Sequence, residues 1–173
     1  MATKVCTHYL SRALVGAAGL LLALGAAASD SSSRYGGENR GKPLAPPEAN
    51  TKWQQECGSC HVAYVPALMG KASWQRVMAG LDKHFGADAS LDAATSREIG
   101  DYLSRNASNR WSAATAPLRI TQTAWFKAKH NAREVDPAVW SRPSVKSAAN
   151  CSACHGGAER GNFNEHEIRI PKS

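Results

Sequence analysis

Two copies of one pentapeptide constrain this chain of 173 residues more than any other feature: CGSCH at residues 57–61 and CSACH at residues 151–155. In each copy, two cysteines three positions apart are followed at once by a histidine. Two thiols at this spacing can add to the two vinyl groups on one edge of a porphyrin, and the next residue can then present its imidazole to the iron. The pattern predicts two covalently bound haem c groups.

Each haem should have two thioether bonds and one axial histidine from its motif. The expected residues are Cys57, Cys60 and His61 for the first haem, and Cys151, Cys154 and His155 for the second. A zinc ribbon would place its two cysteine pairs roughly 15–20 residues apart, whereas here 91 positions separate them. A thioredoxin-like pair needs a βαβ context, which is lacking, and disulfide loops would not explain the histidine after each pair.

The second axial ligand of each iron decides whether the chain carries electrons or binds a small molecule. We expect His84 to serve the first haem, because it lies 23 residues after His61 on the apolar side of a predicted helix. We expect His130 to serve the second haem, because it follows Phe126 by four residues on another predicted helix. Both assignments depend on proximity along the chain, so a swapped arrangement remains open.

Two methionines and a third histidine compete for these positions. Met69 lies eight residues after His61, and it would have to round the porphyrin edge within a chain of at most about 28 Å. Met78 is expected in the core. His166 lies between two glutamates in NEHEIRI, which favours a solvated position on the surface.

Two histidine ligands on each iron would leave no coordination position open to a substrate. Histidine in place of methionine also lowers the reduction potential. We therefore predict two low-potential, low-spin haems that transfer electrons, and no catalytic residue. The alternative is a dihaem peroxidase or small-ligand reductase with one open haem iron, and a third hypothesis is a haem-based sensor or gas-binding module.

The first 28 residues have the pattern of a secretory signal peptide. Lys4 and Arg12 precede an apolar run of 16 residues, and Ala26–Ala28 supply small residues for cleavage before Ser29. The run is shorter than the roughly 20 residues that span a bilayer, although an uncleaved anchor is the alternative. We expect a periplasmic protein whose residues 29–50, rich in Ser, Gly and Pro, form a flexible leader.

The 145 residues after the signal peptide are poor in the side chains that usually build a core. Leu, Ile, Val and Phe together make up 19 of these 145 residues, or about 13%. A charged chain with less than roughly 20% of these residues is usually disordered. Five tryptophans and two porphyrins can supply the missing apolar volume. We therefore predict that the apoprotein is largely unfolded.

Helical periodicity dominates the remaining pattern, so we expect a mainly α fold. A first helix is predicted over residues 73–85, with Ser73 as its N-cap and Gly86 as its stop. Its apolar stripe consists of Trp74, Val77, Met78, Leu81 and Phe85.

A second helix is predicted over residues 91–107, with Ser90 as its N-cap. Its buried side is marked by Ile99, Tyr102 and Leu103. A third helix should start at Thr121 or Thr123, and residues 135–143 should be irregular because they contain two prolines. The motifs divide the chain into an N-terminal haem c domain at 51–108 and a C-terminal one at 109–173.

The sequence resembles the bacterial dihaem cytochrome c family over most of residues 53–171. The resembling segments are ECGSCHVAYVPALM, SWQRVMAGLDKHFGADASLD and REIGDYL, followed by RITQTAWFKAKH, NCSACHGGAERGNF and EIRIP. The resemblance implies an N-terminal unit similar to a class I cytochrome c and a C-terminal unit that is irregular, with few helices. It also implies bis-His ligation, which maps onto His84 and His130.

The same resemblance implies the redox partners of the protein. Electrons would pass between a membrane b-type cytochrome and a small oxygen-binding monohaem cytochrome. We expect a monomer. The formal net charge of +7 does not indicate nucleic-acid binding, because the chain is expected to be exported and has no platform of interleaved basic and aromatic residues.

Overall fold

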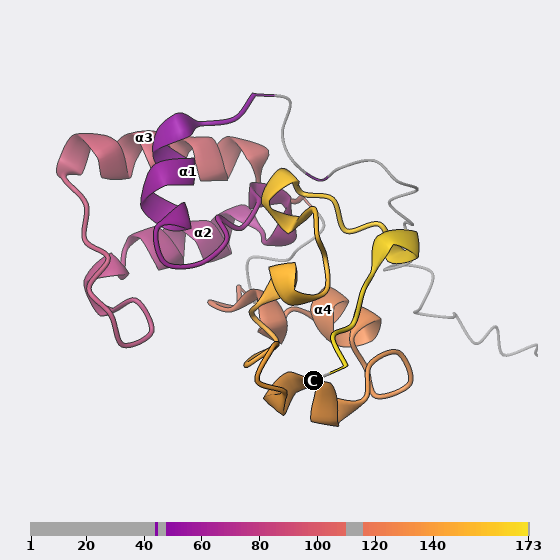
Figure 1. Ribbon diagram of the computed structural model, residues 1–173. Coiled ribbons are helices and arrows are strands. Elements are labelled where there is room, and N and C mark those ends of the chain that lie inside the picture. The colour runs from indigo at the N-terminus through magenta and orange to yellow at the C-terminus, as the bar shows by residue number, and fades with distance from the viewer. Residues whose placement is uncertain (1–43, 45–47, 110–115, 173) are drawn as a thin grey trace, which may run out of the picture. The chain divides into compact units, whose positions relative to one another are not determined.

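The computed structural model describes residues 44, 48–109 and 116–172, which belong to one compact unit of the chain. The predicted signal peptide and nearly all of the predicted leader lie outside the described residues. The described part is mainly helical, as predicted, and it contains no β-strand (Figure 1). No helix within these ranges has the length and apolar character needed to cross a membrane.

Helix α1 (Thr51–Gly58) carries the first cysteine of the first motif in its last turn. Asn50 caps this helix, because its side-chain oxygen accepts a hydrogen bond from the Trp53 amide at 2.7 Å. Trp53 is buried and anchors the helix in the core. This helix was not predicted from the sequence.

Helix α2 (Lys71–Met78) is shorter than predicted and begins earlier. The prediction of Ser73 as the N-cap was wrong: Gly70 occupies that position, and Ser73 is buried within the first turn. The predicted continuation to residue 85 was also wrong. The chain leaves the α-helix at Ala79 and Gly80, where glycine disfavours further helix, and resumes as a 3-10 turn at Leu81–Lys83.

Phe85, which was predicted on the buried stripe of that helix, is instead 47% exposed. Its backbone is left-handed, with φ of 51°, and Gly86 follows with φ of 102°. Gly86 is therefore part of a tight turn after the 3-10 segment and does not end an α-helix. Its lack of a Cβ atom makes this positive φ accessible.

Helix α3 (Ala93–Asn106) packs against α2 and buries the three residues predicted for its inner side. Ser90 was predicted as its N-cap, but the N-cap is Asp92. The Asp92 carboxylate accepts hydrogen bonds from the amides of Ala94 and Thr95 at 2.9 and 3.0 Å. Ser90 lies two residues earlier, where its own amide donates to the Asp88 carboxylate.

The C-terminal region (residues 116–172) contains one short α-helix, α4 (Ala124–Lys129), and is otherwise made of 3-10 turns and loops. Thr123 caps α4, in agreement with one of the two predicted starts. Its Oγ1 atom accepts from the Phe126 amide at 3.1 Å and donates to the Ile120 carbonyl at 2.8 Å. The 3-10 turns of this region are Ile120–Gln122, Pro137–Ser141, Cys151–Ala153, Ala158–Arg160 and Glu165–Glu167.

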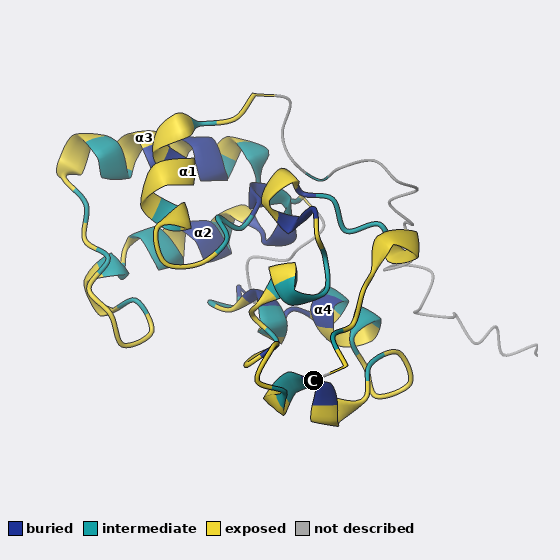
Figure 2. Cartoon of the chain, viewed as in Figure 1, coloured by how far each residue is buried: buried dark blue, intermediate teal, exposed yellow. Residues whose placement is uncertain are grey.

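One cluster of buried side chains forms the hydrophobic core. Figure 2 shows buried residues on α2 and α3, and the cluster extends to Ile120 and Phe126 from the C-terminal region. The other members are Trp53, Val65, Leu68, Met69, Trp74, Ile99, Tyr102 and Leu103. Residues on both sides of the predicted domain boundary thus share one core.

Candidate functional site

The first motif lies at the end of α1, and its histidine faces a second imidazole. The rings of His61 and His84 have centroids 6.2 Å apart and planes inclined at 27°. Nδ1 of His61 lies 2.8 Å from the carbonyl oxygen of Val62. When Nδ1 carries the proton it donates to this oxygen, and the lone pair of Nε2 is then available to a metal.

The break after α2 puts His84 in this position. Because the chain leaves the helix at Gly80, His84 follows the 3-10 turn and does not lie on a helical face. The Ala87 amide donates to the His84 carbonyl at 3.1 Å, which closes a turn over residues 84–87. The guanidinium carbon of Arg119 lies 3.9 Å from the centroid of the adjacent Phe85 ring.

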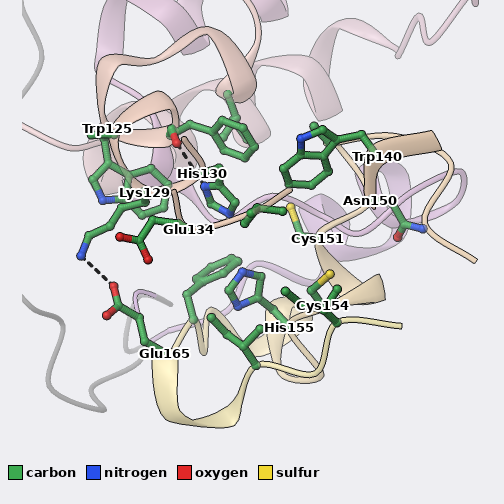
Figure 3. Close-up of a pocket in the computed structure, with 18 of the residues that line it drawn as sticks. Trp125, Lys129, His130, Glu134, Trp140, Asn150, Cys151, Cys154, His155 and Glu165 are labelled. Atoms are coloured by element: carbon green, nitrogen blue, oxygen red, sulfur yellow. Dashed lines mark hydrogen bonds and ion pairs between the residues drawn. The ribbon is translucent and has the colours of Figure 1, made fainter. Parts of the chain in front are cut away.

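The second motif faces His130 across a pocket of about 410 Å³ (Figure 3). The rings of His130 and His155 have centroids 6.1 Å apart and planes inclined at 69°. Cys151 and Cys154 line the same pocket, together with aromatic side chains that include Trp140. All the groups expected to hold the second haem therefore converge on one cavity.

His130 is held firmly at the end of α4. Its Nδ1 atom lies 3.1 Å from the carbonyl oxygen of Phe126, so a protonated Nδ1 donates within the last turn of the helix. Its ring stacks on the Phe126 ring, with centroids 4.0 Å apart and planes at 8°, and the Trp140 ring lies 6.0 Å away. These contacts fix the ring plane and leave Nε2 available.

The second motif has a local backbone structure of its own. The amides of Cys154 and His155 both donate to the carbonyl oxygen of Cys151, at 3.2 and 2.8 Å. The Arg169 amide donates to the Cys154 carbonyl at 3.0 Å, which ties the C-terminal tail to the motif. This tail segment, EIRI, alternates in sequence but forms no strand.

Burial shifts the pKa of several side chains in the two sites. It lowers the pKa of His84, His130 and His155, which favours neutral imidazoles that can bind a metal. It raises the pKa of Cys57 and Cys151 to about 11, so that both thiols are protonated at neutral pH. None of the four motif cysteines forms a disulfide.

The two imidazole pairs fit a shared metal ion. Two rings that each bind one ion through a nitrogen at roughly 2 Å would have centroids about 6 Å apart. The observed separations are 6.2 Å for the first pair and 6.1 Å for the second. In the described part of the chain no three His, Cys, Asp or Glu side chains form a metal cluster. Each pair offers two imidazoles, which is the number of axial ligands that a porphyrin iron can take from the protein.

The other candidate ligands lie elsewhere. Met69 is buried in the hydrophobic core and Met78 packs against that core. His166 is exposed on the 3-10 turn at Glu165–Glu167, in agreement with the surface position predicted for it. The aromatic residues beside the motif histidines, notably Tyr64 and Phe163, were not predicted, because no spacing in the sequence links them to a histidine.

A helical chain with two Cys-x-x-Cys-His segments, each of whose histidines faces a second imidazole, defines a c-type cytochrome with two haem sites. Residues 53–163 match the dihaem cytochrome c family. The chain belongs to this family, and it carries two covalently bound c-type haems, each with one iron. No curated protein matches the chain.

Solved structures of diheme cytochromes c resemble the chain in both sequence and fold. One from Rhodobacter sphaeroides is 41% identical, covers 66% of this chain and 97% of its own, and has a TM-score of 0.62. DHC purified from the same organism is 46% identical, with coverages of 67% and 98% and a TM-score of 0.59. The diheme cytochrome sb-DHC of Shewanella baltica is 35% identical, with coverages of 71% and 94% and a TM-score of 0.63.

Proposed function

We propose that this protein transfers electrons through two haems, one held between His61 and His84 and the other between His155 and His130. When bound, each haem supplies a one-electron couple between ferric and ferrous iron. The chain supplies the axial imidazoles, the cysteines for attachment and, at the second site, a largely apolar pocket that limits the access of water. Because neither iron keeps an open position, we expect no peroxidase or reductase activity.

The observation that carries this proposal is the equal spacing of the two histidine pairs. Their centroid separations of 6.2 and 6.1 Å match the separation of about 6 Å expected for two imidazoles bound to one metal ion. The buried setting of His130 and His155 also favours the neutral form that binds iron. Ligation by two histidines supports low reduction potentials, since a methionine ligand is what raises the potential of many small cytochromes c.

Electronic and EPR spectra of the purified ferric protein test the proposed ligation. We expect low-spin signals alone, and we expect the reduced protein not to bind carbon monoxide. A high-spin ferric band, or ready binding of carbon monoxide, would favour the alternative of an enzyme with one open iron. A redox titration followed optically gives both potentials in the same experiment.

Single histidine variants test which residue serves which iron. His84→Ala should convert the first haem to high spin and open it to carbon monoxide, and His130→Ala should do the same to the second. His166→Ala is the matched control, because His166 is exposed on a surface turn, and it should leave both haems low-spin. A high-spin haem in the control would reject the assignment.

The proposed site of action is the periplasm, which the signal-peptide pattern of residues 1–28 supports. The proposed partners are a membrane b-type cytochrome as one redox partner and a small oxygen-binding monohaem cytochrome as the other. Mixing the reduced protein with each purified candidate in a stopped-flow instrument tests this. Slow exchange with both would reject the partner proposal without affecting the ligation.

A further inference from the structure

Tyr64 joins the first histidine pair to the second attachment motif. Its ring stacks on that of His61, with centroids 4.7 Å apart and planes at 23°. Its hydroxyl donates a hydrogen bond of 2.7 Å to the backbone carbonyl oxygen of Ala149, which lies 85 residues further along the chain. The Sγ atom of Cys151 lies 3.6 Å from the same oxygen. One side chain thus contacts a ligand of the first site and reaches a carbonyl group beside the attachment sulfur of the second.

The hydroxyl of Tyr64 is suited to this bond. Burial raises the pKa of Tyr64 to about 12, so that the group keeps its proton at neutral pH and acts as a donor. Other hydrogen bonds also join distant parts of the chain, among them Arg76 to the Ala116 carbonyl at 2.5 Å and Leu44 to the Gly161 carbonyl at 2.8 Å.

We propose that Tyr64 is a positioning residue that fixes the plane of the His61 imidazole and provides a contact route along which electrons pass between the two haems. Electronic coupling falls less steeply along covalent and hydrogen bonds than across empty space. The route runs from the His61 ring to the phenol ring, across the hydrogen bond to Ala149, and along two peptide units to Cys151. The inference rests on the proposed function. Tyr64 is not itself oxidised: the electron lost by one iron is gained by the other, and no proton moves.

Two substitutions separate the parts of this role. Tyr64→Phe keeps the ring that stacks on His61 and removes the hydroxyl, whereas Tyr64→Leu removes both. Tyr102→Phe is the matched control, because it removes a hydroxyl from a buried tyrosine of the same core whose ring packs on Trp53 with a centroid separation of 5.3 Å. All variants are tested as the intact protein with both haems attached.

The rate of electron exchange between the haems is measured after a light-triggered reductant delivers one electron to the protein. We expect a several-fold slower exchange in Tyr64→Phe, a still slower exchange in Tyr64→Leu, and no change in Tyr102→Phe. An unchanged rate in Tyr64→Phe overturns the proposal, and so does an equal fall in the Tyr102→Phe control.

The EPR signal of the first haem is the second measurement, and a merely structural role in folding would not move it selectively. It should be unchanged in Tyr64→Phe and shifted in Tyr64→Leu, because only the latter frees the His61 ring. If Tyr64→Leu does not retain both haems, the rate in Tyr64→Phe alone decides. A high-spin haem in the parent protein would reject the proposed ligation, while the rate comparison among the variants would still test Tyr64.

Discussion

The imidazole planes of His130 and His155 are inclined at 69°, close to perpendicular. Those of His61 and His84, at 27°, are close to parallel. A low-spin ferric haem has two iron d orbitals of similar energy that interact with the axial imidazoles. Two parallel rings interact with the same one of these orbitals and separate the two energies. Two perpendicular rings each interact with a different one, so the two energies stay similar. We therefore predict two different EPR signals from this protein, with the larger maximal g value from the second haem.

The two signals can be assigned with the histidine variants. His130→Ala should remove the signal with the larger maximal g value and His84→Ala should spare it. Two signals of the same shape in the parent protein would contradict the difference in ring planes.

Thr123 should contribute measurably to the stability of the second site. It caps α4, in which Phe126 stacks on the ring of His130 just beyond the helix, and its hydroxyl is buried. Thr123→Ala should lower the free energy of unfolding by about 1–2 kcal/mol, as for other threonine caps. Denaturant unfolding of the haem-loaded protein measures this. Thr123→Ser keeps the hydroxyl and should retain most of the stability; equal losses in both variants would show that the cap is unimportant.

Gly157 should not tolerate a side chain. A Cβ atom at this position would lie 2.8 Å from Cβ of Asn162, whose amide donates to the Gly157 carbonyl at 2.9 Å. Gly157→Ala should therefore cost about 1–3 kcal/mol, as overpacking does elsewhere. The control is Gly156→Ala, because no atom lies within 4 Å of a Cβ atom placed there. Comparable melting temperatures of the two variants would contradict the prediction.

Loss of both haems should unfold the chain. The protein is poor in aliphatic side chains, and its second site is a pocket of about 410 Å³ that the second haem is expected to occupy. A variant with all four motif cysteines changed to serine should show weak helical circular dichroism and no cooperative thermal transition. A native-like, cooperatively melting apoprotein would count against this.

The sequence was most informative where chemistry requires a fixed spacing. The motifs predicted both attachment segments, and the histidines expected to pair from their proximity along the chain have neighbouring rings: His84 with His61, and His130 with His155. Their role as ligands stays a prediction. Tyr64 could not have been found in this way, because its hydrogen-bond partner is 85 residues distant.

Helix boundaries were less predictable because more than one residue near each helix start could act as the N-cap. Ser90 and Asp92 are both good caps, but Asp88 binds the Ser90 amide, so the chain turns there before the helix begins. The apolar pattern continues past Met78 although the helix does not: the 3-10 turn at Leu81–Lys83 buries none of its residues, and Phe85 is exposed. Helix α1 was missed because Trp53 is its only buried residue.

The hydrogen bonds within the second motif bear on the order in which the protein is assembled. The amides of Cys154 and His155 both bind the carbonyl of Cys151, so the segment holds its shape through bonds that close very short loops. Short loops cost little chain entropy, and such a segment can form in a chain that is otherwise unfolded. We therefore expect the C-terminal region to acquire its haem before it has a core, so that its later folding takes place around a group already bonded to the chain.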